Sequence, residues 1–184
     1  MDPIKELNNE HLKISKILDI LEIMVQKMEK NIYIPKADME DILYFSRLFT
    51  DKLHHTKEED GLFAEMFQAG YSKEKGPVAM MLLEHYSGHH CVRNMTQALV
   101  DINKKESTEK FIKNAFEYVT LLRAHILTED KILFLAAKEK LSPNIYRKIG
   151  KEFKIIEAGV LDKKEIKKID KIFLDLNKKY SNIK

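Results

Sequence analysis

The sequence predicts an all-α protein, and three observations support that prediction. Apolar residues recur at intervals of three and four along several long segments, which is the period of an amphipathic helix. Gly and Pro interrupt helices, and the 184 residues include only six of one and four of the other. No segment has the alternating apolar pattern of a strand or the turn signals of a β-hairpin. We therefore expect four long helices followed by two shorter ones.

The expected helices are separated by short polar segments or by Gly and Pro. They span residues 4–30, 36–68, 77–104, 108–140, 143–158 and 162–180. The first has the clearest pattern, because its apolar positions from Ile4 to Met28 follow the 3,4,3,4 spacing of an antiparallel helix seam. Pro77 suits the first turn of the third helix. Ser107 or Thr108 is expected to cap the fourth.

Composition limits the classes of function. Charged residues make up 33% of the chain, yet the net charge is only +3, which does not call for nucleic-acid binding. We also expect no membrane span, because no run approaches 18 apolar residues. A signal peptide is not expected either, because the N-terminus MDPIKELNNEHLKI has no apolar h-region and carries early acidic residues. Cys91 is the single cysteine, so an intrachain disulfide is excluded. A cytoplasmic location is expected.

Five of the seven histidines form a pattern that indicates a buried polar site. His11 occupies a seam position of the first helix, where leucine would be usual. Three pairs with a spacing of four residues follow, and four residues turn through roughly 400°, so each pair shares one helix face. The pairs are His54 with Glu58, His85 with His89, and His125 with Glu129. One buried histidine is commonly satisfied by a hydrogen bond, but metal coordination would satisfy all five together.

The second helix leaves its register open. Its apolar residues centre nearer to His55 and Glu59 than to His54 and Glu58, and both pairs have the same spacing. An internal comparison favours His54 and Glu58. HHTKEEDGLF at 54–63 aligns with HILTEDKILF at 125–134 as His-x-x-x-Glu-acid-x-x-Leu-Phe.

These segments resemble the hemerythrin family, in its bacterial and archaeal HHE cation-binding branch. The resemblance rests on Glu10-His11, HHTKEEDGLF, GPVAMMLLEHYSGHH at 76–90 and HILTEDKILF, and it covers residues 4 to about 137. It implies an up-down-up-down four-helix bundle, as in myohemerythrin, with a non-haem di-iron centre. The bundle is expected over residues 1–140, with residues 141–184 as a helical extension packed on it.

The resemblance also implies how seven ligands are shared between two irons. His85, His89 and His125 would hold one iron, His11 and His54 the other, and Glu58 and Glu129 would bridge them. The iron with two histidines would keep an open position for a small ligand.

Two departures from family patterns leave parts of this set open. Oxygen-carrying hemerythrins use His-x-x-x-x-Asp on the last helix, a spacing that would select Asp130 instead of Glu129. Many relatives carry Arg at the position of His89. Glu84, which precedes His85, could bond a ligand imidazole or lie on an exposed face.

The donor types favour iron. Imidazole and carboxylate ligands without thiolates suit iron, manganese or zinc. Seven ligands exceed the four of a structural zinc site, and carboxylate bridges suit redox cycling. We therefore expect two iron ions (Fe2+/Fe3+) in each chain.

The expected function is binding of O2 or NO for sensing, carriage or defence against oxidative or nitrosative stress. An alternative is a di-iron oxidoreductase that reduces peroxide or NO, or an iron-centre repair protein. Either would need a partner reductase, because the chain has no flavin or nicotinamide fingerprint. A third interpretation is an interaction module in which the metal mainly stabilises the fold. The sequence leaves the oligomeric state open.

Overall fold

The computed structural model describes residues 2–180. Within that range the protein consists of helices and short connections, without a strand. The all-α class expected from the sequence is therefore confirmed.

All six expected helices are present among the described residues. Helix α1 spans Pro3–Glu29. The second long helix joins α2 (Lys36–Phe45), the π-helical segments η1 (Ser46–His54) and η2 (Lys57–Phe63), and α3 (Ala64–Gln68). Helix α4 spans Pro77–Val100. The fourth long helix joins α5 (Lys105–Thr128), the π-helical η3 (Glu129–Leu133) and α6 (Phe134–Lys140). Two shorter helices follow, α7 (Pro143–Val160) and α8 (Lys163–Tyr180).

The helix starts show which local signals were effective. Asp2 caps α1, because its side chain accepts from the backbone N–H of Ile4. Pro77 lies in the first turn of α4, as expected. The expected cap of α5 was wrong. This helix begins at Lys105, so Thr108 already lies inside its first turn. The hydroxyl of Thr108 therefore does not cap the helix and instead donates to the Ile102 carbonyl.

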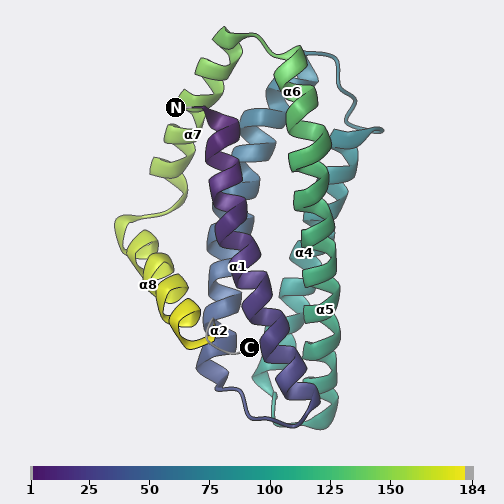
Figure 1. The fold of residues 1–184 in the computed structure, drawn as a ribbon, viewed down its shortest axis with the longest axis vertical. Coiled ribbons are helices and arrows are strands. Elements are labelled where there is room, and N and C mark those ends of the chain that lie inside the picture. The colour runs from purple at the N-terminus through teal and green to yellow at the C-terminus, as the bar shows by residue number, and fades with distance from the viewer. Residues whose placement is uncertain (1, 181–184) are drawn as a thin grey trace.

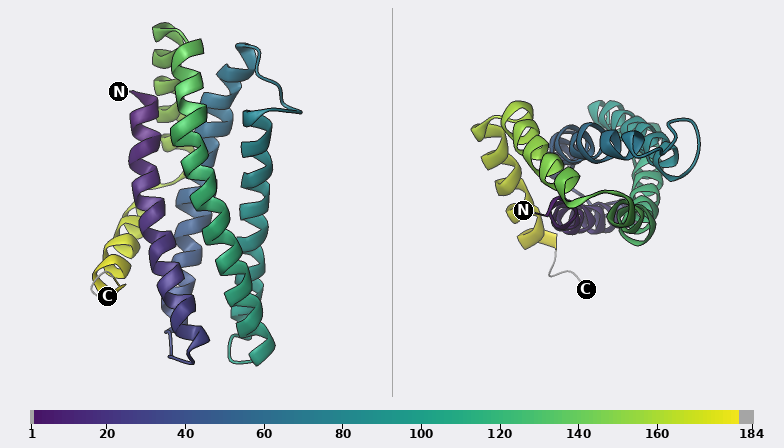
Figure 2. Two further views of the ribbon diagram at one scale, coloured as in Figure 1. Left: turned by 45° about the vertical axis from the view of Figure 1, so that its right-hand side comes forward. Right: turned by 90° about the horizontal axis from the view of Figure 1, so that it is seen from above.

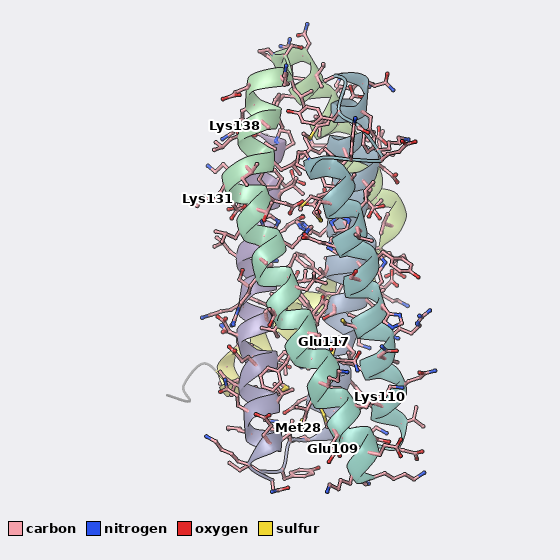
Figure 3. The ribbon with its side chains drawn as sticks, turned by 90° about the vertical axis from the view of Figure 1, so that its right-hand side faces the viewer. Met28, Glu109, Lys110, Glu117, Lys131 and Lys138 are labelled. Atoms are coloured by element: carbon pink, nitrogen blue, oxygen red, sulfur yellow. The ribbon has the colours of Figure 1, made fainter. Side chains whose placement is uncertain are left out.

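The four long helices lie side by side, and successive helices run in opposite directions (Figure 1). Seen from above, they surround a shared interior (Figure 2). Buried side chains from all four helices fill it. Charged residues lie on the outer side of the α5–α6 helix, including Glu109, Lys110, Glu117, Lys131 and Lys138 (Figure 3). No described helix has a stretch long and apolar enough to cross a membrane.

The interior contains two apolar clusters with a polar layer between them. On α1, Leu7 belongs to one cluster and Ile14 to the other, and the buried His11 lies between them. The other long helices follow the same order. The histidine pattern of the sequence therefore marks one level of the molecule.

Helices α7 and α8 pack against α1 and the second long helix (Figures 1 and 2). The closest approach is at Gly61, where an added Cβ would lie 2.5 Å from the ring of Phe153 on α7. Glycine is needed here because Phe153 occupies the space of a side chain. This contact places α7 directly over η2, one turn from the polar layer.

Candidate metal centre

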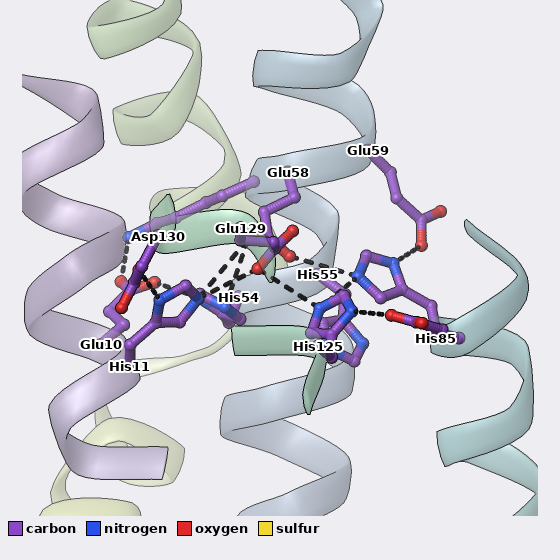
Figure 4. A network of polar contacts seen from close by, with 12 residues as sticks. Glu10, His11, His54, His55, Glu58, Glu59, His85, His125, Glu129 and Asp130 are labelled. Carbon is purple, nitrogen blue, oxygen red and sulfur yellow. Dashed lines mark hydrogen bonds and ion pairs between the residues drawn. The ribbon is translucent and has the colours of Figure 1, made fainter. Parts of the chain in front are cut away.

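Six of the seven predicted donor residues meet in the polar layer, and all four long helices contribute (Figure 4). Each side chain is almost completely buried. They are His11 on α1, His54 on η1, Glu58 on η2, His85 on α4, His125 on α5 and Glu129 on η3.

One set of donors gathers around one oxygen of Glu58. Glu58 Oε1 lies 3.4 Å from His54 Nε2 and 3.8 Å from His11 Nε2. Glu129 Oε2 completes the set, 3.2 Å from His11 Nε2. The four ligand atoms lie within 4.8 Å of one another, so a single ion could contact all of them.

A second set gathers around the other oxygen of Glu58. His85 Nε2 lies 3.3 Å from Glu58 Oε2 and 3.2 Å from His125 Nε2. The remaining member of this set is His55. Because its two oxygens face different sets, Glu58 is placed to bridge two ions. Glu129 Oε2 also lies 3.3 Å from His125 Nε2, so it faces both sets.

His89 is the one predicted ligand that the structure does not bring to the centre. Its side chain is 46% exposed, and its Nε2 lies 3.6 Å from Asp51 Oδ1 and 3.5 Å from His55 Nδ1. The ring of His55 lies between His89 and the donors, stacked on His85. The structure therefore places His89 outside the two donor sets as a neighbour of His55, which lies with Glu58, His85 and His125 in the second set.

The surroundings of His89 also argue against a separate cation site there. A surface cavity of about 390 Å³ adjoins Asp51 and His89, and it is also lined by Arg47 and Arg93. Guanidinium groups repel a cation. We therefore regard Asp51 and His89 as polar partners for the Nδ1 side of His55.

The π-helical turns explain how neighbouring residues of the second helix can all face inward. A π-helix has wider turns than an α-helix, so each residue rotates less about the helix axis. Segment η1 ends at His54, and η2 contains Glu58. His54, His55 and Glu58 are all buried. Both registers left open by the sequence are therefore partly correct. His54 and Glu58 of one register and His55 of the other belong to the donor sets, whereas Glu59 does not.

Four carboxylates hold four of the histidines from outside. Each accepts a hydrogen bond from Nδ1 of a histidine on a neighbouring helix. Glu10 accepts from His54 at 2.8 Å, Glu59 from His85 at 2.6 Å, Glu84 from His125 at 2.9 Å, and Asp130 from His11 at 2.8 Å. Such bonds keep the proton on Nδ1 and leave Nε2 free to bind a metal ion.

These four bonds form a closed ring around the centre. The order runs from α1 to the second long helix, then to α4, then to the α5–α6 helix, and back to α1. We call Glu10, Glu59, Glu84 and Asp130 the outer carboxylates. The ring orients a histidine on every long helix through a residue of its neighbour.

The sequence contained a signal for the outer carboxylates that motif spacing did not use. Each is next to a donor in the chain: Glu10 before His11, Glu59 after Glu58, Glu84 before His85, and Asp130 after Glu129. Asp130, considered above as a substitute ligand, instead bonds His11. The bonded histidine belongs to another helix in every case, so the pairing requires the tertiary structure.

The charges at the centre favour bound cations. Burial opposes protonation of His11, but its hydrogen bond to Asp130 and the nearby carboxylates of Glu129 and Glu58 outweigh this and raise its pKa to about 11. His85 is likewise desolvated, and Glu58 and Glu59 raise its pKa to about 10. Burial raises the pKa of Glu129, and the negative charge of Glu58 adds to that effect. In the metal-free protein, protons on these groups therefore supply positive charge that bound metal ions would otherwise provide.

The unsatisfied atoms of the centre fit metal ions. Six buried ligand atoms have no hydrogen-bond partner: His11 Nε2, His55 Nε2 and all four carboxylate oxygens of Glu58 and Glu129. Unpaired buried polar atoms are costly, and metal bonds would satisfy these together. Imidazole nitrogens and carboxylate oxygens are suitable ligands for iron, manganese or zinc.

Comparison with protein families gives one match. The family described as "Hemerythrin HHE cation binding domain" matches residues 2–137. This span contains both donor sets and the four outer carboxylates. Neither the curated proteins nor the solved structures gave a match.

Proposed function

Because the chain belongs to the hemerythrin HHE cation-binding domain family, we propose that it is a non-haem di-iron protein that binds O2, with NO as the alternative diatomic ligand. Its role would be sensing, carriage or defence against oxidative or nitrosative stress. We further propose that residues 1–140 form the up-down-up-down four-helix bundle of this family, and that α7 and α8 belong to an extension.

One observation is the main support for this proposal: two donor sets share Glu58 but differ in their histidines. The first set has His11 and His54, whereas the second has His55, His85 and His125. Two ions bound there would have unequal numbers of histidine ligands, two in the first set and three in the second. The ion held by fewer histidines keeps room for a small exogenous ligand, as gas binding requires.

The residues of the chain would perform separate tasks at such a centre. Glu58 and Glu129 would balance the charge of two cations, and a pair of ferrous ions held there would supply the electrons that O2 accepts. The outer carboxylates hold the imidazoles in place through a change of oxidation state. Phe134 stacks on His11 and Phe63 on His85, at centroid distances of 5.6 Å and 5.9 Å. These rings limit access of water to the ligands.

An optical experiment tests this function. Anaerobic protein loaded with Fe(II) should develop a visible charge-transfer band on exposure to O2, and the band should bleach when O2 is removed. His54→Ala should abolish the band, because it removes one of the two histidines of the first set. His90→Ala is the matched control, since His90 is exposed and bonds Arg93. A colourless product, or oxidation that argon does not reverse, would reject reversible binding.

A further inference from the structure

Lys57 is a buried cation one residue before the bridging Glu58. Its side chain is fully buried, yet its ammonium group contacts three carboxylates. Glu10 Oε1 lies 2.6 Å from Nζ, while Glu6 and Glu157 each lie at 2.7 Å. A buried lysine remains charged only with such partners. The ammonium group therefore occupies a small acidic site of its own beside the centre.

Glu10 connects this acidic site to the candidate metal ligands. Its Oε1 accepts from Lys57, and its Oε2 accepts from Nδ1 of His54. Among the ion pairs of residues 2–180, none joins a Lys or Arg to the other three outer carboxylates. Of the four histidines that bond an outer carboxylate, His54 is thus the one whose partner also contacts a lysine among the described residues. That histidine belongs to the set with only two imidazoles.

Glu157 brings α7 into the same network. It is the one partner of Lys57 outside the four long helices, and its side chain is 45% exposed. Phe153, one turn earlier on α7, lies against Gly61 and places its ring 5.6 Å from Lys57 Nζ. The chain of contacts therefore runs from α7 through Lys57 and Glu10 to His54.

We propose that Lys57 is a positioning residue that acts on His54 through Glu10 and makes this imidazole a weaker metal ligand, and that Glu157 of α7 opposes this effect. The inference rests on the proposed di-iron centre. A carboxylate that accepts from a ligand imidazole increases its donor strength. Lys57 draws negative charge away from Glu10 and reduces that increase. Glu157 competes for the same ammonium group and so returns charge to Glu10.

Replacement of Lys57 and replacement of Glu157 should change the reduction potential of the centre in opposite directions. In Lys57→Met, Glu10 becomes a stronger acceptor and His54 a stronger donor, which stabilises Fe(III) and lowers the potential. In Glu157→Gln, Lys57 acts more fully on Glu10, so the potential rises. Each change should shift the equilibrium between oxidised and reduced iron by about tenfold, if the effect matches the lower end of what outer partners do to metal affinity.

A spectroelectrochemical titration of the full-length, iron-loaded protein tests the proposal. Glu65→Gln is the matched control, because Glu65 pairs with Lys148 of α7 at 2.6 Å but does not contact the outer carboxylates. The control should keep the wild-type potential, and the two test variants should shift it in opposite directions. If Lys57 only stabilised the fold, Lys57→Met and Glu157→Gln would not shift the reduction potential in opposite directions.

Each remaining outcome is decisive. Unchanged potentials in both variants, or shifts of the same sign, would overturn the role of Lys57. If Lys57→Met does not fold, Glu157→Gln decides alone, since its half-exposed side chain tolerates replacement, and an unchanged or lowered potential would reject the proposal. Wild-type protein that takes up no iron would overturn the proposed function as well. Wild-type iron with a defined potential that neither variant alters would reject this inference only.

Discussion

The imidazole rings of His55 and His85 are stacked, with centroids 3.8 Å apart and planes inclined by 9°. His55 comes from the second long helix and His85 from α4. At the next turn of α4, His89 lies beside His55, with its Nε2 3.5 Å from His55 Nδ1. His55, and not His89, therefore faces the donors of the second set.

Replacement of each histidine should separate these two positions. His55→Ala removes a donor from the second set, so anaerobically reconstituted protein should retain one metal ion firmly and lose the other on gel filtration. His89→Ala should retain both, because its half-exposed ring lies outside the sets. Metal analysis after gel filtration measures the difference. Loss of metal from His89→Ala alone would show that the assignment is reversed.

Adjacent glutamates offer a second comparison. Glu58 faces both donor sets with its two oxygens, so Glu58→Gln should abolish stable binding of a pair of ions. Glu59 only accepts from His85 Nδ1, so Glu59→Gln should bind the pair about 10–100-fold more weakly, as is usual for an outer partner. Competition with a chelator measures both affinities. Equal losses in the two variants would contradict the bridging role of Glu58.

Metal binding should release protons. In the metal-free protein, the pKa of His11 is raised to about 11 and that of His85 to about 10, from an ordinary value of 6.5. Both rings therefore carry a proton at neutral pH that a metal ion must displace. Metal affinity should rise with pH between about 6.5 and 10, because the displaced protons become easier to lose.

The same shifts predict the stability of the metal-free form. A raised pKa contributes stability that is fully present below pH 6.5 and is lost as pH rises through about 10 to 11. For the metal-binding prediction, calorimetric titrations of the metal-free protein with metal, in buffers with different ionisation enthalpies, count the protons that binding releases. An affinity for metal that does not depend on pH would show that these histidines are not ligands.

Two glycines test how closely α7 is packed. Gly61→Ala should destabilise the protein by about 1–3 kcal/mol, because the new methyl group overlaps the Phe153 ring. Gly159→Ala, within α7 itself, meets no atom within 4 Å and should stabilise the protein by up to about 1 kcal/mol through helix propensity. Thermal unfolding of both variants measures the contrast. A neutral Gly61→Ala would mean that α7 does not lie against η2 in solution.

Helical periodicity was sufficient to predict the elements of this fold. The six helices are where apolar spacing and the few prolines indicated, and the largest difference is the end of the third, expected at 104 and found at Val100. Pattern arguments work here because long amphipathic helices repeat one signal many times. The cap of α5 was missed because several polar residues near Lys104 could begin a helix.

The donor sets were harder to predict, for a structural reason. A regular α-helix allows either His54 or His55 to face the interior, but not both equally, so the sequence seemed to require a choice. The π-helical segments remove that choice by rotating less per residue. The residue spacing does not predict these π-helical segments. His89 was chosen because regular α-helical geometry places it on the same face as His85.

The outer carboxylates show a different limit. Each stands beside a donor in the sequence but serves a histidine of another helix, so adjacency alone gives the wrong partner. Glu84 illustrates this, since it precedes His85 and bonds His125. The partner of Lys57 on α7 could not be found from motifs either, because Glu157 lies outside the family match.

The most direct test of the account is the metal content of protein purified without added metal, measured together with protein concentration. We expect two iron ions in each chain, held by the donors that converge on Glu58 and Glu129. A single zinc ion in each chain, with no iron, would contradict the paired centre and the gas binding proposed for it.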